Sequence, residues 1–308
     1  MLSFYKSLNG SILKTEELCD GCWIHVANPS EAETSFLING LHIDPDFVRA
    51  SLDEEESSRI ENEENQTLVI IDTPIEVEDE KQTIPYSTLP MGIIITDKYI
   101  VTVCVRENPI ITEFTNGQVR NIHTHLKTRL LLMILLRIAA KFLFYLKLID
   151  KKSNTIENKL QKSMRNKELI ELRGLEKSLV FFSTSLKSNE ITLEKILRGR
   201  IIKLYEEDQD LLEDVLIEVK QAIEMANIYS SILAGTMNTF ASVISNNLNI
   251  VMKGLTSSTV ILSIPDIVTG FYGMNVDGLP VPHVWFPSLL ITIFVGIVAI
   301  FLNRRHML

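Results

Sequence analysis

Hydrophobic and polar positions divide this chain into a long charged part and an apolar C-terminal end. The apolar end contains two segments, roughly 250–272 and 284–302. The second segment has no charged residue and has about the 20 residues that a helix needs to cross the hydrocarbon core. The first segment is apolar but contains Lys253 and Asp266. We predict a membrane hairpin made of a first transmembrane helix at 249–272, a loop at 273–283 and a second transmembrane helix at 284–303.

The first part of the chain has the pattern of a mixed α/β domain, over residues 1–120. Short runs rich in β-branched residues predict strands at 67–72, 92–96 and 99–105, and the turn at Asp97 and Lys98 makes the last two a hairpin. Ser30 followed by Glu33, and Asp44 followed by Pro45, predict two helix starts.

From about Asn121 the spacing becomes helical, and we predict helices over 121–248. The segment 126–148 is strongly apolar, but regularly placed cations interrupt it, so we interpret it as a buried amphipathic helix. Helical spacing continues over 154–187, with a predicted break at Ser188 and Asn189. Because no proline follows until Pro265, 190–272 reads as one helix on the order of 120 Å long. Such a helix needs partners, and it would form a stalk that continues into the first span.

The first span is partly segregated into faces. Polar and small residues follow one another at intervals of three and four, which places them on one stripe of a helix. The stripe consists of Asn249, Met252, Thr256, Thr259, Ser263, Asp266 and Gly270.

Two interpretations of this stripe compete. Small and hydroxylated residues mediate close helix packing in membranes. Packing does not require the carboxylate of Asp266, however, and a charge in a span marks a functional path. A water-filled path accounts for all members of the stripe. One hairpin cannot enclose such a path, so we expect several symmetric copies around it.

The residue types favour a hard, hydrated cation. Mg²⁺ gives up its bound waters reluctantly, and oxygen acceptors can hydrogen-bond those waters without removing them. Asn275 in the loop offers one amide oxygen per subunit. The stripe contains no thiolate or imidazole, which disfavours a soft-metal site.

Composition excludes several functions. The chain of 308 residues carries a net charge of −9, which argues against a nucleic-acid partner. We find no nucleophile–base constellation and no nucleotide-binding loop, so we expect no enzyme and no organic cofactor. Cys19-Asp20-Gly21-Cys22 has zinc or redox spacing, but no second pair follows and we assign it neither role.

Basic residues predict the orientation. The loop between the spans contains no Lys or Arg, whereas Arg304 and Arg305 lie in the tail at 304–308. The positive-inside rule then places both termini in the cytoplasm of a multi-pass protein of the cell membrane.

The motif Tyr272-Gly273-Met274-Asn275 between two C-terminal spans, followed by a basic tail, resembles the CorA family of magnesium transporters. The long preceding helix and the acidic α/β domain extend the resemblance over essentially the whole chain. The resemblance implies a homopentamer with a funnel of α+β cytoplasmic domains and long stalk helices, embedded in lipid, with the first span lining the pore.

The resemblance also implies roles for individual residues. Gly273, Met274 and Asn275 would form the outer selectivity filter, and Asn249, Met252 and Leu255 an inner constriction that closes by dewetting. Family members close when magnesium occupies acidic cytoplasmic sites, which here would involve Asp214 with Asp208 and Asp210 nearby.

Two positions depart from the family pattern. The loop offers only Asp277 where many members have more acids. Asp266 stands where a neutral hydroxyl residue is more usual, and we hypothesise a second ion site there.

We therefore expect a channel that takes up magnesium down its electrochemical gradient and that magnesium closes from inside. Transport of cobalt, nickel or zinc with a proton gradient as driver is a first alternative, and a membrane-anchored sensor or scaffold without flux is a second.

Overall fold

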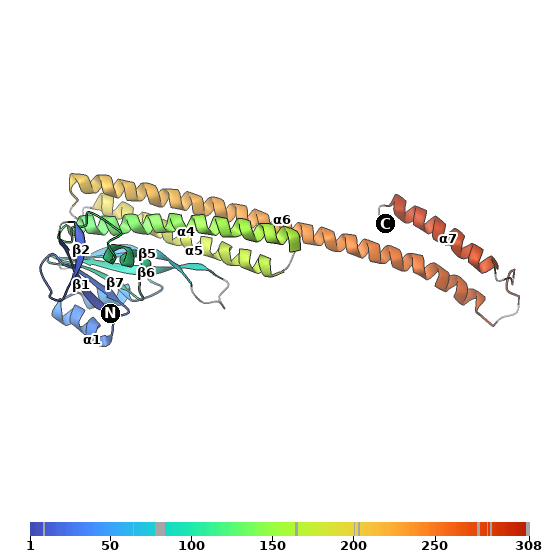
Figure 1. The fold of residues 1–308 in the computed structure, drawn as a ribbon, viewed down its shortest axis with the longest axis horizontal. Helices are drawn as coiled ribbons and strands as arrows, with labels where there is room; N and C mark the ends of the chain where they lie inside the picture. The colour runs from blue at the N-terminus through green and yellow to red at the C-terminus, as the bar shows by residue number, and fades with distance from the viewer. Residues whose placement is uncertain are drawn as a thin grey trace. The chain divides into compact units, whose positions relative to one another are not determined.

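The computed structural model describes residues 1–8, 10–63, 65–77, 84–163, 166–199, 201–202, 204–275, 278–281, 283 and 285–305. The chain forms two compact units, Met1–Thr236 and Met237–Leu308. Helix α6, Glu206–Tyr272, contributes to both units, and helix α7, Trp285–Arg304, belongs to the second (Figure 1).

The first unit is built on a seven-stranded sheet with the order β2-β1-β3-β7-β6-β5-β4. Neighbouring strands are antiparallel except for β3 and β7, which are parallel. The strands are β1 Leu2–Leu8, β2 Ser11–Thr15, β3 Trp23–Ala27, β4 Arg59–Glu63, β5 Gln66–Glu76, β6 Tyr86–Ile95 and β7 Ile100–Cys104.

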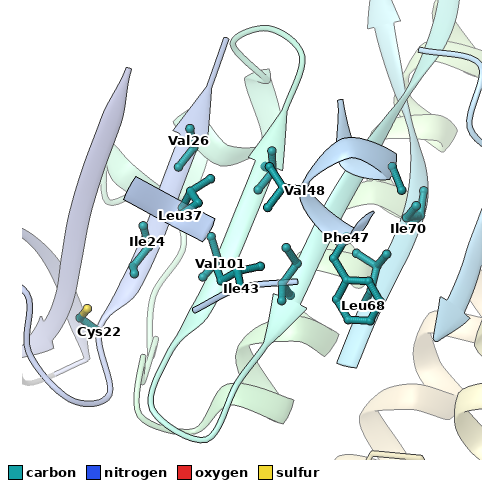
Figure 2. Close-up of a cluster of buried hydrophobic side chains, with 13 residues drawn as sticks. Cys22, Ile24, Val26, Leu37, Ile43, Phe47, Val48, Leu68, Ile70 and Val101 are labelled. Carbon is teal, nitrogen blue, oxygen red and sulfur yellow. The ribbon is translucent and has the colours of Figure 1, made fainter. Parts of the chain in front are cut away.

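Helices cover both faces of this sheet, so its central strands bury side chains on both sides. Figure 2 shows Ile24, Val101 and Leu68 of one face packed with Leu37 and Phe47. The elements on this face are α1 Glu31–Ser35, the π-helix η1 Phe36–Gly40 and α2 Pro45–Ser51. The close approach of α2 requires Gly92, because a Cβ there would lie 1.8 Å from Ser51 Oγ.

Long helices lie on the other face. These are α4 Lys127–Ser163 and α5 Asn166–Gly199, preceded by the short α3 Pro109–Thr115. Phe142 of α4 and Phe182 of α5 meet edge to face with ring centroids 5.1 Å apart, and both are fully buried.

The first part of α6 packs beside α4 and α5. The Ser183 hydroxyl donates to Asn227 Oδ1 at 3.2 Å, and Lys220 Nζ lies 4.0 Å from Glu190 Oε1, so α6 runs antiparallel to α5. Arg129 of α4 pairs with Glu207 at 2.8 Å. Burial of Leu212, Val215, Val219 and Ala226 supports α6 along this length.

Several sequence predictions are confirmed. The three predicted strands are β5, β6 and β7, and Ile95 pairs with Ile100 across the predicted hairpin. Ser30 and Asp44 cap helices as expected, Ser30 with a full capping box. The apolar segment 126–148 belongs to α4 and is largely buried rather than exposed as a span would be. Strands β1 to β4 and helix α3 were not predicted.

The predicted helix over 190–272 is wrong at its start. Helix α5 continues through Ser188 and Asn189 to Gly199, and α6 begins at Glu206. Asn189 does not break the helix because its side chain faces the sheet and is 1% exposed. Its amide donates to Asp72 O at 3.0 Å and its oxygen accepts from Asp72 N at 3.0 Å.

Candidate ion pathway in the C-terminal hairpin

In the part of the chain that the structure describes, two helices have the length and apolar composition to cross a membrane, α6 and α7. Helix α6 continues through Pro265, although a proline inside a helix removes a backbone donor. One turn later, the Thr269 hydroxyl donates to Pro265 O at 2.8 Å. The hydrogen bond satisfies that hydroxyl within the helix, as a lipid environment requires.

The predicted stripe lies on an accessible face of α6. Its members are exposed in the single chain, except that Ser263 is half-buried. Leu255, which belongs to the predicted constriction, is also exposed. The members of the stripe are Asn249, Met252, Thr256, Thr259, Ser263, Asp266 and Gly270.

A different face of α6 is covered. Ser257 is 0% exposed and Ile261, Ile264 and Val268 are half-buried, again at intervals of three and four. Within the described part of the second unit the other element is α7, whose Leu302 is 5% exposed. At about 100° per residue these positions lie nearly opposite the polar stripe. The stripe therefore lies on the face of α6 away from the covered positions.

The hydroxyl groups of α6 point their protons into the helix. The Thr259 hydroxyl donates to Leu255 O at 2.9 Å, and the Ser263 hydroxyl donates to Thr259 O at 2.8 Å. Each oxygen then presents lone pairs, and no proton, to its surroundings. The stripe thus offers acceptors, which suit a cation or its bound waters.

The loop begins where α6 ends. Gly273 N donates to Thr269 O at 2.8 Å, and a Cβ at Gly273 would lie 3.0 Å from that oxygen. Met274 and Asn275 are exposed. The Tyr272 hydroxyl donates to Pro280 O at 3.0 Å, and its ring meets that of Phe286 at 6.3 Å.

Tyr272 thereby ties the two ends of the loop together. In the sequence, Tyr272 was assigned only to the motif, and its role as an anchor was missed. The signal for that role is the preference of aromatic residues for membrane interfaces. Asp277 lies outside the described residues.

The three acids predicted to regulate the path have different surroundings. Asp208 is 4% exposed and accepts from Tyr205 N at 3.2 Å, which is the reach of an N3 carboxylate back to the helix N-cap. Asp210 and Asp214 are exposed on α6. Among the described residues of the single chain, no group of three or more His, Cys, Asp or Glu side chains could hold a metal ion.

An apolar hairpin with an open stripe of oxygen acceptors, attached to a large α+β unit, has the features of a cation-conducting membrane protein. The model of the CorA-like Mg²⁺ transporter protein family matches residues 20–305. The chain belongs to this family: it is a divalent-cation transporter and not an enzyme.

A curated relative, the cobalt/magnesium transport protein CorA of Methanocaldococcus jannaschii, is 27% identical over 295 residues, covering 92% of this chain and 90% of the relative. Among solved structures, the complete CorA magnesium transporter of that organism superposes with a TM-score of 0.81 at 24% identity, covering 99% and 96% of the two chains. Full-length CmaX superposes with a TM-score of 0.74 at 14% identity, covering 100% and 97%. At these identities the structural likeness shows the fold alone, and it confirms the predicted fold class.

Proposed function

We propose that this protein takes up Mg²⁺ as a homopentamer in which the polar stripe of α6 lines a central aqueous path. The observation that carries the proposal is the opposition of two faces on α6: Ser257 is buried on one, while Thr259 and Asp266 stay exposed on the other. Lipid is a poor environment for the exposed face, because unpaired polar groups are costly there. Symmetric copies that turn this face inward remove that cost.

The proposed path begins at the loop. Gly273, Met274 and Asn275 form the outer filter, where one amide oxygen per subunit binds the waters of a hydrated Mg²⁺. The path continues along Thr259 and Ser263 and ends at a constriction of Asn249, Met252 and Leu255. The apolar side chains there close the path by excluding water.

The membrane potential drives uptake. One elementary charge gains about 2.3 kcal/mol per 100 mV, and a divalent ion gains about twice that. This direction requires the loop outside and the large unit inside the cell, in accord with the basic residues Arg304 and Arg305 at the end of α7.

We propose that intracellular Mg²⁺ closes the channel by occupying acidic sites between subunits that include Asp214 and Asp210. Both carboxylates are exposed on the single chain and are available to a neighbouring copy. Asp208 is the weakest member of this set, because its carboxylate already accepts from the backbone at the start of α6.

Cobalt is the second candidate ion. The relative from M. jannaschii is named a cobalt/magnesium transport protein, and oxygen ligands of the proposed path also accept Co²⁺.

Flux from purified protein tests the proposal. The full chain is reconstituted in liposomes, and Mg²⁺ or Co²⁺ entry is followed with an internal indicator at a fixed inside-negative potential. We expect Mg²⁺ entry that grows with the potential and does not depend on a pH gradient. Absence of flux for both ions would leave a membrane-anchored sensor, and entry that requires a proton gradient would contradict the proposed driving force.

Asp266 gives the path a second ion site in this proposal. Several carboxylates around one axis repel each other, and a bound cation relieves that repulsion. We expect Asp266→Asn to change the ratio of Mg²⁺ to Co²⁺ uptake and its pH dependence, whereas the off-stripe Thr269→Val leaves both unchanged. Identical ion preference and pH dependence in Asp266→Asn would end this part of the proposal.

A further inference from the structure

The sequence Cys19-Asp20-Gly21-Cys22 forms a tight turn that brings two thiols together. Cys22 N donates to Cys19 O at 3.1 Å, which closes a β-turn. Gly21 occupies its third position with φ +75°, the left-handed conformation that a type II turn requires there. The ends of such a turn lie within the Cα separation that a disulfide spans.

The two thiols share one neighbourhood. Cys22 belongs to the buried core cluster, and Cys19 is partly buried and packs against the same cluster. The turn itself is fixed in place, because Gly21 N donates to Lys98 O at 2.9 Å. A Cβ on Gly21 would lie 3.2 Å from His125 Cβ, so the turn also packs against the segment before α4.

The two cysteines differ in accessibility in the way that a reactive and a resolving thiol differ. Cys19 is half-buried and reachable from solvent, whereas Cys22 is fully buried in the core beside β3. Burial raises the pKa of the Cys22 thiol, and the neighbouring Cys19 contributes. Cys22 therefore stays protonated and has the character of the resolving thiol, whereas Cys19 is the thiol that solvent can reach.

Two other interpretations fit less well. A structural role accounts for the buried Cys22, but not for a second, accessible cysteine at the other end of the same turn. A metal site would need further ligands, and the described residues hold no group of three His, Cys, Asp or Glu side chains suited to one.

We propose that Cys19 and Cys22 form a reversible redox pair that peroxide oxidises to an intramolecular disulfide. In the first step the Cys19 thiolate attacks one peroxide oxygen: an S–O bond forms, the O–O bond breaks, and hydroxide leaves as water after taking a proton. In the second step Cys22 sulfur attacks Cys19 sulfur: the S–S bond forms, the S–O bond breaks, and a second water leaves with the Cys22 proton. The pair loses two electrons and the peroxide gains them.

The test uses the full-length protein in detergent, treated with hydrogen peroxide and then denatured for thiol titration and peptide mapping. The chain has three cysteines, and we expect the free thiols to fall from three to one. Mapping should find a peptide with Cys19 linked to Cys22, and dithiothreitol should restore all three thiols. Cys104 serves as the matched control, because it is 2% exposed and burial raises its pKa to about 12. Cys104→Ser should therefore still form the disulfide.

Variants separate a redox pair from a single reactive cysteine. In Cys22→Ala, Cys19 should be oxidised further, to sulfinic acid, at a peroxide dose that leaves the wild-type pair as a disulfide. The pair is excluded if wild-type protein accumulates Cys19 sulfinic acid as fast as Cys22→Ala does, or if it keeps three thiols at every dose. Mapping of the wild type decides the question even if Cys22→Ala does not fold.

Discussion

The oxygen atoms of the first span show how single residues combine two requirements. A hydroxyl in lipid must satisfy its proton, and Ser263 does so on Thr259 O at 2.8 Å. The same bond leaves its lone pairs outward, as a cation path requires. The proton of the hydroxyl group thus bonds within the helix, and its oxygen lone pairs stay available to a cation.

Gly273 tests how tightly the loop is built. A Cβ there would lie 3.0 Å from Thr269 O, so Gly273→Ala should displace the backbone that carries Asn275. We expect a several-fold loss of Mg²⁺ uptake in liposomes with assembly unchanged. Gly254→Ala is the control, since nothing lies within 4 Å of its added Cβ. Wild-type uptake by Gly273→Ala would show that this close approach is not required.

His25 gives the first unit a predictable pH dependence. The side chain is buried, its Nδ1 lies 2.9 Å from Thr102 Oγ1, and its Nε2 has no hydrogen-bond partner. Desolvation lowers the pKa of His25 from 6.5 to about 4, helped by the N-terminal ammonium and opposed by hydrogen bonding to the Thr102 backbone. The unfolded chain therefore binds this proton first as the pH falls, and the fold loses stability between pH 6.5 and about 4.

The loss from this group amounts to about 3 kcal/mol at the acid end. Chemical denaturation of the full-length protein at several pH values measures it, and His25→Gln should remove that part of the slope. His42→Asn is the control, because His42 is exposed and its φ of 54° suits asparagine. Equal slopes in wild type and His25→Gln would contradict the assignment.

At the scale of elements, Asn189 joins α5 to the edge of the sheet. Strand β4 pairs with β5 only as far as Ile70. Two residues further, the side-chain amide of Asn189 hydrogen-bonds the backbone N–H and C=O of Asp72. Removing it leaves the Asp72 C=O without this partner, at about 1–3 kcal/mol, while the Asp72 N–H keeps its bond to Ser58 Oγ at 3.2 Å. We expect Asn189→Ala to lower the free energy of unfolding accordingly in denaturant titrations.

Asn158→Ala is the matched control for this prediction. Asn158 is exposed on α4, and its amide donates only within its own helix, to Asn154 O at 2.8 Å. Its substitution should cost no more than about 0.5 kcal/mol. A similar small effect for Asn189→Ala would mean that water replaces the amide at the sheet.

Asn189 also marks where sequence reasoning fails. Runs of β-branched residues predicted β5, β6 and β7, and long apolar segments predicted α4 and α7. The side chain of Asn189 pairs with a strand that is distant in sequence, and no local signal distinguishes it from a helix breaker. Strand β3, Trp23–Ala27, was missed because His25 interrupts its apolar residues and only Ile24 and Val26 are β-branched, whereas β7 is a richer β-branched run.

The polar stripe of α6 was predictable in its residues, because a helical wheel needs only the sequence. What the wheel could not give is which positions of α6 are covered, since this depends on packing. Burial of Ser257 supplies that information. The roles of Asp208, Asp210 and Asp214 stay predictions, because they depend on neighbouring copies.

At the scale of the whole molecule, regulation should depend on acids shared between copies. We expect Asp214→Asn to raise the internal Mg²⁺ concentration needed to stop uptake, with initial uptake unchanged. Glu224→Gln, an exposed acid on the same helix, should leave that concentration as in wild type. Titration of internal Mg²⁺ in liposomes measures both. An unchanged closing concentration in Asp214→Asn would remove Asp214 from the gate.

Assembly is the other property of the whole molecule. Native mass spectrometry in detergent should give a five-subunit species. A stable monomer or dimer that still conducts would contradict a path enclosed by symmetric copies.

Cysteine accessibility tests the central claim most directly. Ser263 lies on the stripe and Ser258 lies off it, so Ser263→Cys and Ser258→Cys form a matched pair in a background without native cysteines. In liposomes, a charged, water-soluble thiol reagent should modify Ser263→Cys and block Mg²⁺ uptake, while Ser258→Cys stays unmodified in lipid. A Ser263→Cys that is sealed from the reagent in every condition, with or without Mg²⁺, would contradict an aqueous path along this face of α6.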